Sequence, residues 1–145
     1  MTSLIGNANG LKPHHLNELP LFEKTYLPPD YGDKLISRVY PDGSLYYLTQ
    51  PRLKEKSNPE TEKWNFIATV TSKGIAEIQK ILEKCSEVDS EVVHGGNVRG
   101  AVIWKIVHFN HIHEVVIAGI PEGKYRIFQE LDPIISTNLE PVGSH

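Results

Sequence analysis

The stretch AVIWKIVHFNHIHEVVIAGI, residues 101–120, decides the fold of this chain. Two apolar runs lie on either side of the polar dipeptide Asn110–His111 at its centre. A two-residue turn at this dipeptide predicts a β-hairpin in which Phe109 pairs with Ile112. Both arms alternate in side-chain character and are rich in Ile and Val, which favour strands.

The register of this hairpin sorts its side chains onto two faces of a sheet. Lys105 and Glu114 share one face, and no charge falls among the apolar residues of the other. The charged face also carries Ile103 and Val107. We therefore expect both faces to be covered in part, either by a helix and the N-terminal segment or by a second copy of the chain. The apolar face consists of Val102, Trp104, Ile106, Val115 and Ile117.

A second hairpin is predicted from residues 35–40 and 44–49. Three turn-forming residues join these runs. Pro41 presets the first φ angle of the turn, Asp42 can accept a hydrogen bond from the nearby backbone, and Gly43 supplies a positive φ.

A further strand and the principal helix follow along the chain. Residues 64–70 alternate with a period of two, which predicts a strand with four residues on one face: Trp64, Phe66, Ala68 and Val70. Residues 72–85 repeat apolar positions every three to four residues, which predicts a helix capped by Thr71 or Ser72. Its buried stripe consists of Ile75, Ile78, Ile81, Leu82 and Cys85.

These elements predict one α+β domain made of residues 34–136. It contains a mostly antiparallel sheet of five to seven strands, with the helix at about 72–85 packed on one face. Residues 1–33 hold four prolines and show no sustained hydrophobic period, so we interpret them as an extended arm. Residues 137–145 are interpreted as a C-terminal tail.

Composition excludes several classes of protein. The chain has 145 residues, 15 Lys and Arg against 18 Asp and Glu, and a net charge of -3, which disfavours a nucleic-acid binder. It has no apolar run of about 18 residues and no N-terminal signal pattern, so we expect no membrane contact and a cytoplasmic location. Cys85 is the only cysteine, and its place on the helix stripe predicts a buried, inert thiol.

The histidines form the one group of residues with a pattern that suggests chemistry. Three of them occur within six residues, and the expected register places His108 directly opposite His113. Their Cβ atoms would then lie about 4.5–5.5 Å apart, close enough for the two imidazoles to share a metal ion or a proton. The candidate binding residues are therefore His94, His108, His111, His113 and Trp104.

The same residues also have a simpler interpretation as amphipathic side chains at the ends of strands. A catalytic zinc ion needs three protein ligands, and Glu114 points to the opposite face. Only His94 or His111 could supply the third, so we assign no metal ligand. We assign no catalytic residue either, because the chain has no nucleophile elbow. His14 and His15 fall in the arm and are interpreted as exposed polar surface.

The sequence favours a non-catalytic binding or assembly protein that makes protein–protein contacts and self-associates. It leans against an enzyme without excluding one. Two alternatives stay open: a small enzyme that uses the histidine cluster with or without a metal, and a small-molecule carrier. The carrier would hold its ligand between sheet and helix, beside Trp64, Trp104 and Tyr125. No cofactor is predicted, and the expected partner is a protein, including a second copy of the chain.

Overall fold

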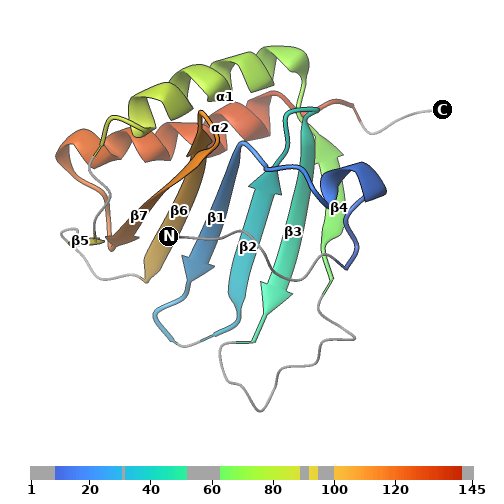
Figure 1. The fold of residues 1–145 in the computed structure, drawn as a ribbon. Helices are drawn as coiled ribbons and strands as arrows, with labels where there is room; N and C mark the ends of the chain where they lie inside the picture. Colours follow the sequence, from blue (N-terminus) through green and yellow to red (C-terminus); the bar gives the residue numbers. More distant parts are fainter. Residues whose placement is uncertain (1–8, 31, 52–62, 89–91, 95–99, 142–145) are drawn as a thin grey trace.

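A seven-stranded sheet forms the centre of the computed structural model (Figure 1). The strand order is β4-β3-β2-β1-β6-β7-β5, and all neighbours are antiparallel except β5, which runs parallel to β7. The prediction of an α+β fold with a mostly antiparallel sheet is confirmed. The strands are β1 (Phe22–Leu27), β2 (Lys34–Val39), β3 (Ser44–Gln50), β4 (Asn65–Thr69), β5 (Val92–His94), β6 (Ala101–His108) and β7 (His111–Ala118). The structure describes residues 9–30, 32–51, 63–88, 92–94 and 100–141, with the backbone alone for 92–94.

The principal helix packs on one face of the sheet, as predicted (Figure 1). Thr71 caps it by accepting a hydrogen bond from the backbone N–H of Gly74 at 3.1 Å. The helices are η1 (Pro13–His15), α1 (Ser72–Cys85), η3 (Gly123–Glu130) and α2 (Leu131–Thr137). The main core between helices and sheet includes Phe22, Ile78, Trp104, Ile106, Phe128 and Leu131. Within the described residues, no helix is both long enough and apolar enough to cross a membrane.

The β6–β7 hairpin has the predicted faces but a different register. Its turn residues are Phe109 and Asn110, with φ angles of 49° and 64°, so His108 pairs with His111 and not with His113. Two consecutive positive φ angles are the pattern of a type I′ turn, which matches the twist of the strands. Because the register moves by two residues, each side chain keeps its predicted face. The apolar face is buried at Trp104, Ile106, Val115 and Ile117.

The region expected to be an arm supplies the central strand of the sheet. Strand β1 pairs with β2 on one side and with β6 on the other. The expectation of an extended arm over residues 1–33 therefore does not hold for Phe22–Leu27. Glu23 and Thr25 are buried on one face of this strand, and Lys24 lies on the other. These polar residues remove the alternation of apolar and polar positions by which a strand is recognised.

The other face of the sheet carries a smaller core near β2, β3 and β4. Leu11, from the N-terminal segment, packs against it. The helices therefore cover one face and part of the N-terminal segment covers the other, which is one of the two arrangements expected from the sequence. The buried residues of the smaller core are Ile36, Tyr40, Tyr46, Leu48 and Trp64.

A bulge in β4 divides the alternating residues of that strand between the two faces of the sheet. Phe66 and Ala68 pair with consecutive residues of β3, so the ladder skips Ile67. An extra residue of this kind moves the side chains that precede it to the other face. Trp64 accordingly lies in the smaller core, whereas Val70 lies in the main core. The prediction that these alternating residues share one face is wrong.

Glu23 of β1 and Arg38 of β2 form a buried ion pair. Arg38 Nε donates a hydrogen bond to Glu23 Oε2 at 2.7 Å, and each residue is only 7% exposed. A second guanidinium nitrogen of Arg38 donates to the hydroxyl of Tyr40 at 3.2 Å. The guanidinium carbon lies 4.4 Å from the centroid of the Trp64 ring, a cation–π distance.

This pair belongs to a row of alternating charges that crosses four strands. Glu23 is the ladder neighbour of Arg38 on one side and of Lys105 on the other. Lys105 in turn pairs with Glu114 on β7. Because opposite charges that face each other across strands are favourable and like charges are not, the row stabilises this register over its neighbours.

Removing one member of the buried pair should destabilise the fold strongly. We expect Glu23→Leu to lower the free energy of unfolding by about 3–5 kcal/mol, because it leaves the Arg38 charge buried without its carboxylate. The double variant Glu23→Leu/Arg38→Met should recover most of this loss. Urea unfolding followed by tryptophan fluorescence measures both.

Asp132 provides the matched control, because it forms an exposed ion pair with Lys24. Asp132→Ala should cost less than about 1 kcal/mol. A loss in Glu23→Leu no larger than that of the control would contradict the role given to the buried pair.

Candidate functional site

The structure brings together two of the four predicted histidines. His108 and His111 are ladder partners at the two ends of the β6–β7 turn. His113 lies one step further along the same face, and its Nε2–H donates a hydrogen bond to the carbonyl oxygen of Val88. This bond ties β7 to the segment that follows α1, which is a structural contact.

His94 lies far along the sheet from the other three. Its backbone pairs with that of Ala118, five residues beyond His113 on β7, or about 16 Å at the usual rise of a strand. Glu114 points to the opposite face, as the sequence indicated. Among the side chains that the structure describes, none completes a metal site with His108 and His111.

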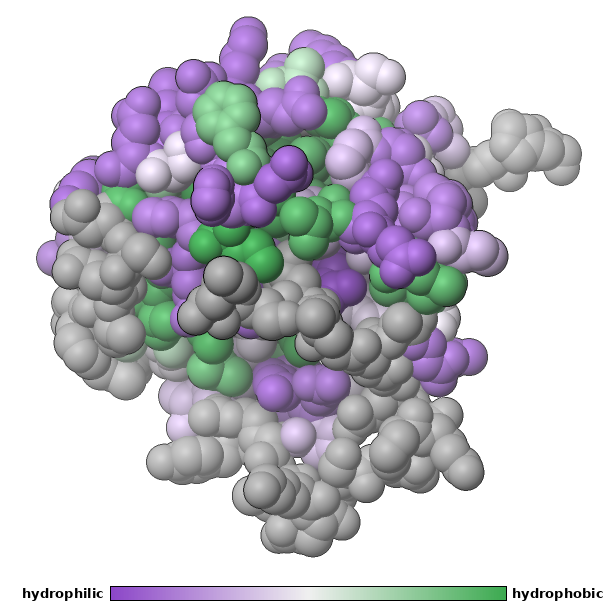
Figure 2. Space-filling model, in the orientation of Figure 1, coloured by the Kyte–Doolittle hydropathy of each residue, from purple (hydrophilic) through white to green (hydrophobic). Residues whose placement is uncertain are grey.

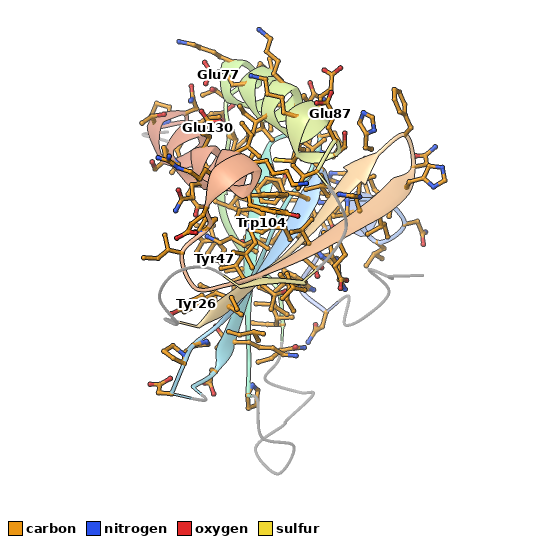
Figure 3. The ribbon with its side chains drawn as sticks, turned by 90° about the vertical axis from the view of Figure 1, so that its left-hand side faces the viewer. Tyr26, Tyr47, Glu77, Glu87, Trp104 and Glu130 are labelled. Atoms are coloured by element: carbon orange, nitrogen blue, oxygen red, sulfur yellow. The ribbon has the colours of Figure 1, made fainter. Side chains whose placement is uncertain are left out.

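Trp104 lines a small cavity between the sheet and the helices, beside Lys24 and Asp132. Figure 3 shows Trp104 beneath the helices. The cavity has a volume of about 180 Å³, below the roughly 300–1,000 Å³ of most small-molecule pockets. Trp64 lies on the other face of the sheet and Tyr125 lies in the main core. The cavity expected for a carrier, with these three aromatic residues together, is therefore not formed.

Among the residues that the structure describes, one group of metal-ligand side chains lies at the β2–β3 turn, where His14 and His15 meet Asp42. One ligand atom from each residue lies within 4.8 Å of the other two. Nε2 of each histidine is 3.1 Å from the same carboxylate oxygen, Oδ2 of Asp42. Glu18 places Oε1 3.7 Å from Nε2 of His15. We call His14, His15 and Asp42 the histidine–aspartate cluster.

His15 is the fixed member of this cluster. It is 1% exposed, and its ring stacks on Tyr40 with the ring centroids 4.1 Å apart. Its Nδ1 lies 2.8 Å from the hydroxyl of Tyr46, which also accepts a hydrogen bond from the backbone N–H of Lys12. Pro13 begins the short helix η1, and that turn directs the imidazole of His15 onto the sheet.

Asp42 is held by the local geometry of its turn. Its Oδ1 accepts a hydrogen bond from the backbone N–H of Ser44 at 2.9 Å, so Oδ2 is left to face the two histidines. Burial raises the pKa of the Asp42 carboxyl. Hydrogen bonds from Ser44 and His14, together with the charge of His15, outweigh that effect and hold the pKa well below its ordinary value.

Sequence reasoning missed this cluster, because it interpreted His14 and His15 as exposed surface. A pair of adjacent histidines and an aspartate in a turn were the available signals, but His15 and Asp42 lie 27 residues apart. Neither segment shows by itself that the fold brings them together. Two imidazole nitrogens and one carboxylate oxygen that converge on one point can bind a proton or a metal cation.

A groove lies at the same end of the sheet, between the N-terminal segment and the β6–β7 turn. It has a volume of about 610 Å³, and Phe109 at its side is 84% exposed. Figure 2 shows apolar groups, in green, at the surface near the top of the view, where the β6–β7 turn lies in Figure 1. We call this the turn-end groove. Its lining residues are Asn17, Glu18, Leu19, Pro20, Leu21, Pro41, Val107, Phe109 and Asn110.

Comparison with protein-family models and with curated proteins gave no match for this chain.

Cys85 is buried in the main core at the end of α1, in agreement with the expectation of an inert thiol. Burial, with a smaller contribution from the negative charge of Glu130, raises the pKa of the Cys85 thiol to about 12. Because only the thiolate is a good nucleophile, this environment suppresses its reactivity.

We expect Cys85 in the native protein to resist Ellman's reagent at about pH 8, where its thiol stays protonated. Unfolding in urea should make the same thiol react at once, because the unfolded state restores both access and an ordinary pKa. The absorbance of the released thiolate measures both rates. A native rate close to the unfolded rate would show that Cys85 is accessible and activated.

Proposed function

We propose that this chain is a non-catalytic binding protein that self-associates through Phe109 and the turn-end groove. The observation that carries the proposal is the exposure of a large aromatic ring in a backbone conformation that disfavours it. We place this association in the cytoplasm, a reducing compartment that suits a chain whose one cysteine, Cys85, is a free thiol.

Phe109 has a φ of 49°, in the left-handed region that glycine, asparagine and aspartate favour at hairpin turns. Holding an aromatic residue there costs about 1–3 kcal/mol. Within the monomer little offsets this cost, since the side chain is 84% exposed and its ring lies against that of the adjacent His108, with 4.2 Å between the centroids. Burying the ring against another chain would contribute about 1.5–3 kcal/mol.

The surface beside Phe109 has the shape that would receive such a ring. The turn-end groove is lined in part by apolar residues, among them Leu19, Leu21 and Val107. The ring protrudes next to the groove on the same surface patch. When two copies of this patch face each other, the ring of each copy can fit the groove of the other. A two-fold axis would then place each Phe109 in the groove of the other chain. Aromatic anchors in pockets dominate the energy of many such contacts. A second copy of the chain is therefore the partner that this surface favours.

The substitution Phe109→Asn separates the cost of the turn from the gain in association. We expect the monomer to become more stable by about 1 kcal/mol, because asparagine accepts the left-handed conformation. Self-association should weaken by at least about 100-fold, because each dimer loses two buried rings. Sedimentation velocity over a range of concentrations measures the association, and urea unfolding measures the stability.

Ile67→Asn is the matched control, because Ile67 is also a large exposed apolar residue but lies on the edge strand β4, away from the groove. Its association constant should equal that of the unchanged chain. A chain that stays monomeric at millimolar concentration, or that associates equally well with Phe109→Asn, would overturn the proposal.

A further inference from the structure

We propose that His14, His15 and Asp42 form a binding site for one divalent transition-metal ion of the zinc type, with Glu18 as the adjacent fourth ligand. All of its ligands come from one chain and Phe109 is not among them, so metal binding can be tested apart from self-association, although Glu18 also lines the turn-end groove. The ion would hold the N-terminal segment against the β2–β3 turn.

Two of the separations between ligand atoms are close to those around a tetrahedral ion. Ligands at about 2.0–2.1 Å from a zinc ion lie about 3.3 Å from one another. Nε2 of His14 and Nε2 of His15 each lie 3.1 Å from Oδ2 of Asp42. Because one ligand atom from each residue lies within 4.8 Å of the other two, a rotation of the exposed His14 ring would bring the three onto one ion.

Tyr46 supplies the outer contact that a metal-bound histidine needs. Ligating imidazoles almost always use their second ring nitrogen in a hydrogen bond that sets the tautomer and the ring orientation. Nδ1 of His15 lies 2.8 Å from the Tyr46 hydroxyl oxygen, which can accept a hydrogen bond from Nδ1–H. An ion would displace the proton through which Nε2 of His15 contacts Asp42, and the tautomer protonated on Nδ1 would then direct the Nε2 lone pair at the ion.

The site combines fixed ligands with an open side. His15 is buried between tyrosine rings, and Asp42 is held through Oδ1 by the backbone of Ser44. By contrast, the side chain of His14 is 58% exposed, so an ion can approach from solvent. Fixed ligands lower the entropy cost of binding, because little has to be ordered when the ion arrives.

The chemistry of the ligands selects the class of ion. Two imidazole nitrogens and a carboxylate suit Zn²⁺ and the neighbouring ions Co²⁺, Ni²⁺ and Cu²⁺, whereas Mg²⁺ and Ca²⁺ prefer oxygen ligands throughout. Glu18 Oε1, 3.7 Å from Nε2 of His15, lies near enough to complete a four-ligand set after a small side-chain movement.

The site is tested by titration of the chelator-treated chain with Zn²⁺ by calorimetry, and with Co²⁺ by its visible absorption. We expect one ion per chain at neutral pH and a higher midpoint of thermal unfolding in its presence. His14→Ala and Asp42→Asn should each weaken binding by at least about 100-fold. Tyr46→Phe keeps all ligands, and should weaken binding by about 10–100-fold through the lost hydrogen bond.

His111→Ala is the control, since His111 is an exposed histidine outside the cluster, and it should bind as the unchanged chain does. The Phe109→Asn chain should also bind one ion, which separates this test from that of self-association. The exposure of His14 keeps its variant folded, and circular dichroism checks this. Absence of stoichiometric binding, binding retained in His14→Ala and Asp42→Asn, or loss in His111→Ala instead would overturn the site.

Discussion

The buried ion pair between Glu23 and Arg38 is the interaction on which the placement of the N-terminal segment depends. Each charge would cost several kcal/mol if it were buried alone, so the two must be buried together. Strand β1 satisfies this only beside β2, in the register that sets Glu23 opposite Arg38. Lys105 on β6 then lies on the other side of the same carboxylate. A strand whose three middle residues, Glu23, Lys24 and Thr25, are polar can in this way occupy the centre of the sheet, between the two hairpins.

Both candidate sites follow from that placement. Because β1 begins at Phe22, the residues before it must cross the end of the sheet that carries the β2–β3 and β6–β7 turns. Backbone bonds from Leu21 to Val39 and to Val107 fix this crossing on both sides. The same segment carries the two histidines that meet Asp42 and the residues that line the groove beside Phe109. An unattached arm would form neither the histidine–aspartate cluster nor the groove.

The sequence predicted the features that depend on local chemistry. The turn at Pro41-Asp42-Gly43, the apolar stripe of α1 and the two faces of the β6–β7 hairpin were predicted correctly, because each is encoded within about twenty residues. The hairpin register was wrong by two residues, since Phe109 takes a turn position that steric rules reserve for smaller residues. The place of β1 and the meeting of His15 with Asp42 were missed, because both depend on pairing between distant segments. Strand β1 in particular is stabilised by a buried charge, which hydrophobic patterns do not reveal.

Hydrogen exchange of the β1 backbone amides, followed by NMR, tests most directly whether the N-terminal segment is part of the sheet. If the ion pair fixes this strand between β2 and β6, its amides should exchange only through global unfolding, with the same opening free energy as those of β6. Exchange of the β1 amides through a local opening of clearly lower free energy, while those of β6 stay protected, would contradict the account.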